Sequence, residues 1–306
     1  MDHHIKKQKS DNPQRLHQPV LLAEVLACLS PNKGESYLDV TAGYAGHARA
    51  VLDQTKAPAK VTLVDRDEAA IAELHKALPR VQTIRNDFLT ASKQLSESGR
   101  KYHMILADLG VSSPHLDNAG RGFSFMTEAP LDMRMDNSQT LTADVIVNTY
   151  DESAISDLLW KYGEEPKARQ IARRIVQARP LKSTTQLAAV VAKAWPGRSK
   201  THPATRTFQA LRIAVNDELQ LLESAIPLWI DMLEPQGRLA IISFHSLEDR
   251  IVKNAFHERS IGYESEVVLI TKGPITASAT ELVTNPRARS AKLRAVLKQK
   301  YGERQK

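Results

Sequence analysis

Residues 37–46, which read YLDVTAGYAG, constrain the fold more than any other stretch of the chain. The stretch begins with an apolar run typical of a buried strand and then passes into small residues. Among these, Gly43 and Gly46 permit a sharp turn and the close approach of a ligand to the backbone. The next segment, residues 47–52, predicts a helix whose N-terminal N–H groups face the turn. Such a unit is typical of sites for nucleotide-type cofactors, although many glycine turns of this kind bind no ligand.

The chain after this turn alternates between strand and helix patterns. Apolar runs predict further strands at 61–65, 81–84, 104–109 and 238–244, and the segments 266–271 and 292–297 could form a closing hairpin pair. Alternation of this kind predicts an α/β fold with a mostly parallel, doubly wound sheet. Ligands of such sheets lie at the carboxyl ends of the strands, where Asp65, Phe88 and Asp108 fall.

The alternation stops between residues 112 and 216, where no convincing strand pattern occurs. Helix patterns at 151–161, 166–178 and 184–195 predict an inserted helical domain, and Arg169 and Arg173 share one face of the second helix. We therefore expect a disordered basic tail at 1–15, a sheet domain made of 16–111 and 217–306, and a helical insertion at 112–216.

The return to the sheet domain is predicted to be helical from 206 to 233, with a kink or split at Pro227. Gly237 is expected to end this helical run. Gln209, Arg212 and Asn216 recur on one face of it. A solvated polar face is the ordinary interpretation of such a stripe, and a lining of the ligand cleft is the alternative.

Composition limits the function classes. The 306-residue chain has one cysteine, Cys28, so an internal disulfide framework and a cysteine-based metal site are excluded. The ten histidines are scattered and predict no metal site. No apolar run approaches the roughly 20 residues that span a bilayer, and the polar N-terminus lacks a signal-peptide core, so we expect a cytoplasmic protein. The net charge of +7 is clustered rather than spread, which favours a nucleic-acid partner.

Three cofactors compete for the glycine turn. A phosphate-binding P-loop is excluded because no GK[ST] follows the glycines. A dinucleotide site requires G-x-G-x-x-G, and here Ala45 replaces the glycine that would approach the pyrophosphate. S-adenosylmethionine has no pyrophosphate. It needs a carboxylate for its ribose, supplied by Asp65, and an apolar wall for its adenine, supplied by Phe88.

The segment after the fourth strand reads DLGVSSPH, residues 108–115. It places an acid, two hydroxyls (Ser112 and Ser113), Pro114 and the ring of His115 beside the expected methyl donor. The arrangement partly matches the [S/D]-P-P-aromatic loop with which amino-methyltransferases hold the exocyclic amine of a base. An unrelated turn is the alternative for so short a segment.

Several long stretches are similar to one known family. The chain resembles the bacterial RsmH (MraW) family of 16S rRNA cytosine-N4 methyltransferases in residues 108–114, 121–135, 202–216, 243–253 and 285–290. These five stretches follow the family's order, and the resemblance extends over roughly residues 16–297. It implies a class I methyltransferase fold with an inserted helical domain, S-adenosylmethionine as the methyl donor, and a cytidine of the decoding region of 16S rRNA as the acceptor.

The resemblance also implies functional residues. The cofactor contacts that it transfers to this chain are Ala45, Gly46, His47, Asp65, Phe88, Asp108 and His115. His115 stands where the family usually has glutamine, and the turn departs from the family's T-F-G-R-G-G-H.

For catalysis we expect Ser112, Ser113 and Pro114 to position the amine of the target cytosine. Asn216 and His245 are candidates to hold the base or to accept its proton, with a structural role as the alternative for each. Two other functions remain open: an NAD-linked oxidoreductase, which Ala45 disfavours, and an rRNA-binding assembly factor that has lost catalysis. The sequence leaves the oligomeric state open, with a dimer as one option.

Overall fold

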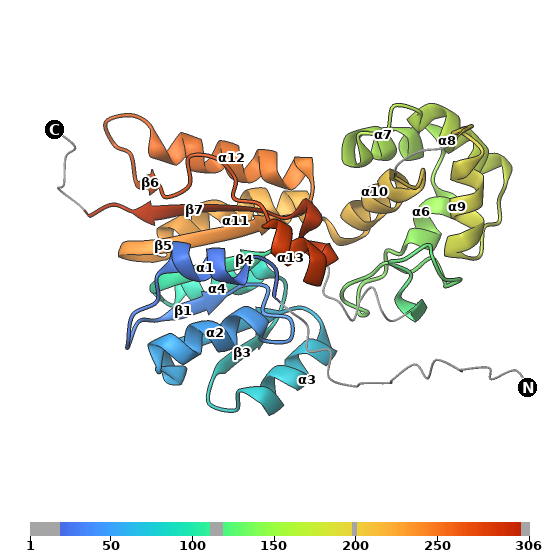
Figure 1. The fold of residues 1–306 in the computed structure, drawn as a ribbon. Helices are drawn as coiled ribbons and strands as arrows, with labels where there is room; N and C mark the ends of the chain where they lie inside the picture. Colours follow the sequence, from blue (N-terminus) through green and yellow to red (C-terminus); the bar gives the residue numbers. More distant parts are fainter. Residues whose placement is uncertain (1–18, 111–118, 198–200, 301–306) are drawn as a thin grey trace, which may run out of the picture.

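The computed structural model describes residues 19–110, 119–197 and 201–300. Two bodies are visible in Figure 1: a twisted sheet covered by helices on both faces, and a bundle of short helices beside it. The predicted basic tail, and with it the boundary at residue 16, lies outside the described residues.

The sheet has seven strands in the order β3-β2-β1-β4-β5-β7-β6. The strands are β1 (Tyr37–Asp39), β2 (Val61–Asp65), β3 (Gln82–Arg85), β4 (Tyr102–Asp108), β5 (Leu233–Ser243), β6 (Val267–Leu269) and β7 (Lys292–Lys298). The first five are parallel because a helix connects each to the next, and β7 lies antiparallel between β5 and β6. The predicted strands and the closing antiparallel pair are confirmed.

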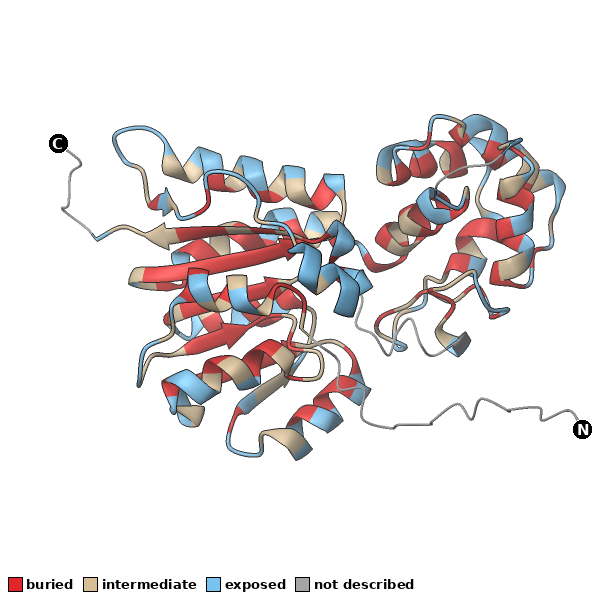
Figure 2. Ribbon diagram, viewed as in Figure 1, coloured by how far each residue is buried: buried red, intermediate tan, exposed pale blue. Residues whose placement is uncertain are grey.

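Alternate residues of the strands enter two different hydrophobic clusters. Leu63, Met104 and Leu106 pack with α1 (Leu22–Leu29), α2 (Gly46–Thr55) and α3 (Glu68–Ala77) on one face. Leu38, Val64 and Ile105 pack with α4 (Phe88–Glu97), α11 (Glu218–Asp231) and α12 (Ser246–Ser260) on the other. Both faces of the sheet are therefore dry (Figure 2), which explains the nearly continuous apolar runs in the sequence. A short helix, α13 (Ala279–Thr284), precedes β7.

The second body has its own hydrophobic core, formed by residues between Phe123 and Val215. Its helices are α6 (Ala143–Thr149), α7 (Glu152–Gly163), α8 (Ala168–Gln177), α9 (Thr184–Ala192) and α10 (Thr205–Asn216). In α8 the apolar residues are buried, while Arg169 and Arg173 are exposed. The α/β fold with an inserted helical unit, predicted from the sequence, is confirmed.

Two local predictions are wrong. The predicted helix at 206–233 is split at Asp217, which has a left-handed φ of 52°, whereas Pro227 lies inside α11. Gly237 does not end a helix, because α11 ends at Asp231 and β5 begins at Leu233. The helix α6 was not predicted. Among the described residues, no helix is long and apolar enough to cross a membrane.

Candidate cofactor and substrate site

A pocket opens at the carboxyl ends of the parallel strands. It is bordered by the ends of β1, β2, β3 and β4, by α11, by the residues that follow β5, and by Met135 of the helical body. Of the cofactor contacts implied by the resemblance, Gly46, His47, Asp65, Phe88 and Asp108 line this pocket. Residues from five strand-to-helix connections and from α11 therefore meet in one place, as the parallel topology requires.

The glycine turn after β1 forms one wall. Gly43 has a left-handed φ of 49°, which favours glycine, and a Cβ on Gly46 would lie only 2.6 Å from Cγ of Pro19. Ala45 also has a left-handed φ, 66°, and its N–H donates to the Ala42 carbonyl at 2.9 Å. Ala45 is fully buried in the core beneath the turn and does not line the pocket. Its contribution is therefore to the shape of the turn.

Asp65, at the end of β2, organises this wall. Its Oδ2 accepts a hydrogen bond from the Gly43 N–H at 2.8 Å, and its Oδ1 accepts one from the Asp67 N–H at 2.8 Å. A carboxylate oxygen can accept more than one hydrogen bond, so the group can hold the turn and still accept from a ribose hydroxyl.

Phe88 begins α4 and closes the pocket beyond β3. Asp87 caps this helix by accepting from the N–H groups of Leu89 and Thr90. The Phe88 ring meets Trp229 edge to face, with ring centres 5.5 Å apart, and only 8% of Phe88 is exposed. This packing fixes an apolar surface against which a flat base can lie.

Asp108, at the end of β4, lies in the middle of the pocket. Its Oδ2 is 3.7 Å from Nδ1 of His47, whose Nε2–H donates to the Val20 carbonyl at 2.9 Å. Oδ1 of Asp108 is buried and has no hydrogen-bond partner among the described residues. Burial, together with the nearby charges of Asp39 and Glu248, raises the pKa of Asp108 well above its usual value. A cationic ligand placed here would relieve this concentration of negative charge.

The two candidates for holding the base have clear partners in the structure. The Asn216 amide donates to the carbonyls of Met133 and Arg212, and its oxygen accepts from the Met135 N–H, each at 2.8 or 2.9 Å. Asn216 is 3% exposed and does not line the pocket, so it fixes a loop of the helical body. His245 caps α12, with Nδ1 accepting from the Glu248 N–H at 3.4 Å.

Two charged residues of the site, Glu218 and Glu248, were not singled out from the sequence. Arg212 was, as part of a polar face with Gln209 and Asn216, and none of these three residues lines the pocket. Glu218 and Glu248 line the pocket, and Arg212 makes two hydrogen bonds of 2.9 Å to the Glu218 carboxylate. Arg212 and Glu218 are six residues apart, which is not a helical spacing. The pair forms because the chain turns at Asp217, and no periodicity in the sequence signals this.

The described pocket suits S-adenosylmethionine. Its wall contains a carboxylate at a glycine turn, which matches a ribose, and an apolar surface at Phe88, which matches an adenine. The excess of acids in the wall matches the cationic sulfur and the amino group of the cofactor. Ser112, Ser113, Pro114 and His115 lie outside the described residues, and their roles stay predictions. Gly110, shortly before them in the chain, lines the pocket.

A sheet of five parallel strands followed by an antiparallel β7 between β5 and β6, with a pocket at the β1 turn, defines a class I S-adenosylmethionine-dependent methyltransferase. The model of the MraW methylase family matches residues 14–299, and the chain belongs to this family. The predicted family, enzyme class and cofactor are thereby confirmed.

Relatives match over most of their length. Ribosomal RNA small subunit methyltransferase H of Picosynechococcus sp. is 49% identical over 288 residues, covering 91% of this chain and 95% of the relative. The protein of the same name from Heliobacterium mobile is 46% identical over 307 residues, covering 92% and 98%. Among solved structures, TrmN from Thermus thermophilus is 11% identical over 91% of this chain and 48% of its own, with a TM-score of 0.42.

Proposed function

We propose that this protein transfers a methyl group from S-adenosylmethionine to the exocyclic N4 of a cytidine in the decoding region of 16S rRNA. The observation that carries the proposal is the convergence of Asp65, Asp108 and the β5 end on a single pocket that borders the helical body. The names of the relatives, ribosomal RNA small subunit methyltransferases, support the RNA of the small ribosomal subunit as the substrate. The proposed site of action is the cytoplasm, with the small ribosomal subunit as the partner.

In this proposal, residues at different strand ends bind the cofactor and the methyl acceptor. Asp65 and Phe88 hold the nucleoside end of the cofactor at β2 and β3, and Asp108 faces its cationic part at β4. The acceptor enters at the β4–β5 end, where Ser112, Ser113 and Pro114 follow Gly110 and are proposed to position the amine. His245 lies at the same end, beyond β5, and stays a candidate for contact with the base. The helical insertion, 112–216, is proposed to hold the RNA.

The chemistry requires positioning more than acid–base help. When bound, the cofactor supplies a methyl group on a positively charged sulfur: the N4–CH₃ bond forms as the S–CH₃ bond breaks, its electron pair stays on sulfur, and N4 releases one proton. The cytosine amine is a weak nucleophile because its lone pair is delocalised into the ring. Orientation can contribute up to about 7–11 kcal/mol, and a proton acceptor adds a factor of roughly 10²–10⁴. The target base must leave its stack to reach the pocket.

The test is transfer of labelled methyl to small subunits from cells that lack this protein, followed by mass mapping of the modified nucleotide. We expect one labelled cytidine, modified at N4. Asp65→Ala should weaken S-adenosylmethionine binding by roughly 10- to 100-fold, because hydrogen bonds to a charged group are worth about 1.5–3 kcal/mol.

Asp53→Ala is the matched control, because the Asp53 side chain is 82% exposed on α2 and should leave binding unchanged. Binding of small subunits without transfer of label to their RNA would instead support the assembly factor that has lost catalysis. Binding of NADH in place of S-adenosylmethionine would support the oxidoreductase.

A further inference from the structure

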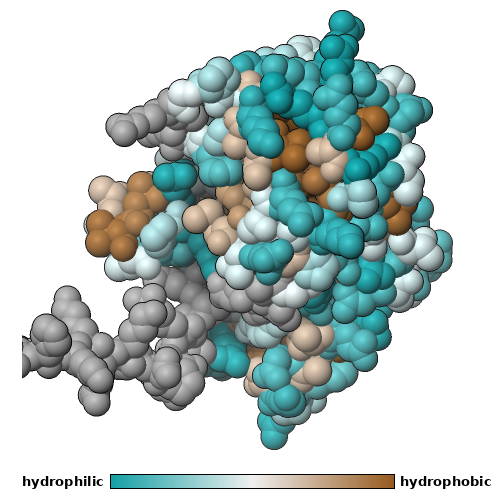
Figure 3. Space-filling view, turned by 90° about the vertical axis from the view of Figure 1, so that its right-hand side faces the viewer, coloured by the Kyte–Doolittle hydropathy of each residue, from teal (hydrophilic) through white to brown (hydrophobic). Residues whose placement is uncertain are grey.

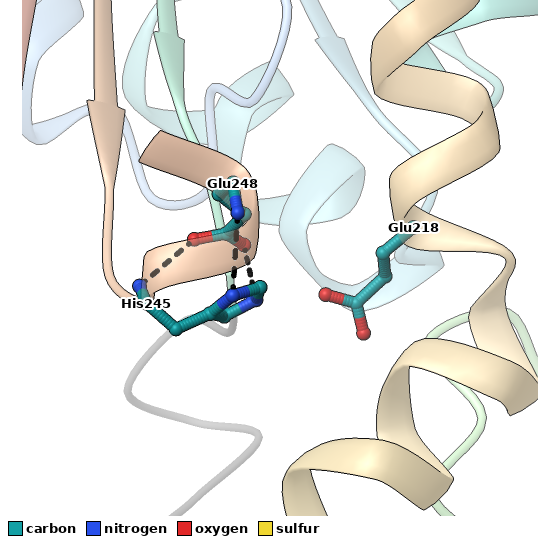
Figure 4. Close-up of side chains that lie close together, drawn as sticks. All are labelled: Glu218, His245 and Glu248. Carbon is teal, nitrogen blue, oxygen red and sulfur yellow. Dashed lines mark hydrogen bonds and ion pairs between the residues drawn. The ribbon is translucent and has the colours of Figure 1, made fainter. Parts of the chain in front are cut away.

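A polar cluster made of Arg212, Glu218, His245 and Glu248 lies at the β5 end of the pocket, where the acceptor is proposed to enter; Arg212 and His245 stand beside the lining residues and are not themselves part of the lining. Glu218 and Glu248 line the same pocket as Asp65, but at its other end. β1 and β4 separate β2 from β5, so the two ends are roughly 14 Å apart at a strand spacing of about 4.8 Å. A cofactor held at its ribose by Asp65 therefore leaves the cluster to the methyl acceptor. Figure 4 shows Glu218 reaching from α11 toward His245 and Glu248 at the start of α12.

The two carboxylates of the cluster differ in what already binds them. Oε2 of Glu248 accepts from the N–H groups of Phe244 and His245, at 2.7 and 3.3 Å, and so completes the cap of α12. Burial opposes the ionisation of Glu248, but His245, Arg212 and the Phe244 N–H outweigh it and hold its pKa below the usual value. Glu218 is held in one orientation by the two hydrogen bonds from Arg212, and its oxygens retain lone pairs for a ligand.

His245 contributes a hydrogen-bond donor whose one close acceptor, Oε1 of Glu248, is poorly aligned. Because Nδ1 accepts from the Glu248 N–H, the neutral ring carries its proton on Nε2. The side chain is 8% exposed, and Nε2 has no hydrogen-bond partner among the described residues. It lies 3.1 Å from Oε1 of Glu248, close enough for an electrostatic interaction but without the alignment of a hydrogen bond. A buried donor without a well-aligned acceptor is suited to a ligand that supplies one.

Each of Glu218, His245 and Glu248 offers an atom to this space, and the three atoms lie within 4.8 Å of one another. A metal ion is one ligand that such a group could hold. The hydrogen bonds argue against it, because a metal needs a lone pair on Nε2, where the proton resides, and the Arg212 guanidinium already lies 3.8 Å from Glu248. The free positions are instead a carboxylate acceptor and an N–H donor side by side.

We infer that Glu218 and His245 bind the Watson–Crick edge of the target cytosine. This inference rests on the proposed function and assigns two contacts within it. Glu218 accepts a hydrogen bond from the N4 amine, and His245 Nε2–H donates to N3. A carboxylate is the usual partner of the cytosine amine, and adjacent groups on a base edge need partners only a few ångströms apart. Arg212 is a positioning residue that fixes Glu218.

This arrangement also distinguishes cytidine from uridine. Uridine presents O4, an acceptor, where cytosine presents its amine, and it presents an N–H at position 3. It would therefore set its O4 against the Glu218 carboxylate and its N3–H against the His245 N–H. Leaving two buried polar groups mismatched is a strong source of discrimination.

The experiment compares Glu218→Gln with the wild-type protein in single turnovers on small subunits, at saturating S-adenosylmethionine. The rate should fall roughly tenfold or more, because the N4 amine loses a charge-assisted hydrogen bond, while the affinity for S-adenosylmethionine stays unchanged. Subunits with uridine at the target position serve as a competitor. They should inhibit the wild-type protein about tenfold or more weakly than cytidine subunits do, and a glutamine amide, which can donate to O4, should remove that preference.

Two further variants keep the result interpretable. Asp217→Asn removes the neighbouring exposed carboxylate, tolerates the left-handed backbone and should change neither rate nor preference. His245→Asn retains a capping oxygen for α12 but removes the ring N–H, and should reduce the cytidine preference without lowering the melting temperature by more than a few degrees.

A Glu218→Gln protein that keeps the wild-type rate and the preference for cytidine would overturn the inference. Binding of Zn²⁺ or Mn²⁺ to the isolated protein, abolished by Glu218→Gln, would replace it with a metal site. Absence of methyl transfer by the wild-type protein would refute the proposed function itself.

Discussion

Asp39, at the end of β1, illustrates the electrostatic repulsion between carboxylates that are buried at the carboxyl ends of neighbouring strands. It is 2% exposed, and its oxygens accept hydrogen bonds from the Tyr37 hydroxyl at 2.8 Å and the Thr41 N–H at 3.1 Å. Burial nevertheless raises the pKa of Asp39 to about 7, and Asp65 adds to the rise. Neighbouring strand ends thus carry carboxylates that repel one another until a cation lies among them.

The raised pKa of Asp39 predicts a pH-dependent stability. The folded protein retains a proton that the unfolded chain has already lost, so this group's stabilising contribution is complete below about pH 4 and is lost as the pH rises through 7. Asp39→Asn removes the dependence. Without cofactor, the variant should therefore gain stability relative to the wild type between pH 4 and pH 8, by up to about 4 kcal/mol.

Urea denaturation at both pH values measures the difference. Asp53→Asn, on an exposed side chain, should differ from the wild type equally at pH 4 and pH 8. A constant difference for Asp39→Asn as well would show that folding does not raise the pKa of this carboxyl.

At the scale of elements, the junction between α10 and α11 joins the helical body to the sheet. Asn216 ends α10 and ties its last turn to residues 133–135, and Arg212 reaches across the turn at Asp217 to Glu218. Met135 and Glu218 both line the pocket. The Asn216 amide does not itself line the pocket. It fixes the loop at residues 133–135 and thereby the position of Met135 in the pocket wall.

Asn216→Ala should lower the free energy of unfolding by about 2–4 kcal/mol, because it leaves the Met135 N–H and the Met133 carbonyl buried without their partner. Denaturant titration of the full chain measures this, with the exposed Gln220→Ala as the control. Unchanged stability combined with a large loss of methyl transfer would assign Asn216 to the bound base instead.

These elements also show what the sequence could predict. The strands and the acids at their ends were predictable because buried β-branched runs are local and because parallel strands place their carboxyl ends together. The break at Asp217 was not, since the neighbouring Asn216 is held by residues 133–135, which are distant in the chain. The approach of Glu218 to Glu248, which joins two helices, likewise depends on tertiary packing and leaves no periodic signal.

At the scale of the molecule, the pocket lies beside the helical body. Figure 3 shows the side of the molecule on which this body lies, where hydrophilic side chains surround smaller groups of hydrophobic ones. The contact between the bodies is itself polar: Glu164, after α7, accepts hydrogen bonds from Ser246 and Arg250 of α12. On α8, Arg169 and Arg173 are exposed while Ile171 and Ile175 anchor the helix in its core. A long strand of RNA that enters the pocket would have this body beside it.

Replacing Arg169 and Arg173 together with alanine should therefore weaken RNA binding and reduce its dependence on salt. Each phosphate contact on a single strand contributes about 0.7 to the slope of log K against log salt, so the slope should fall by about 1 to 1.5. Arg173 lies 3.5 Å from the Glu152 carboxylate, which partly neutralises its charge. We therefore expect Arg169 to contribute the larger part of this decrease in slope. Fluorescence anisotropy with a labelled rRNA fragment at several salt concentrations measures the slope.

The matched control replaces Arg80 and Arg100 with alanine. These two residues are exposed and precede β3 and β4, so they lie toward the amino ends of the strands, away from the pocket, and their loss should leave the slope unchanged although it removes the same charge. Equal slopes for both double variants would place the RNA elsewhere, since net charge alone would then account for the binding.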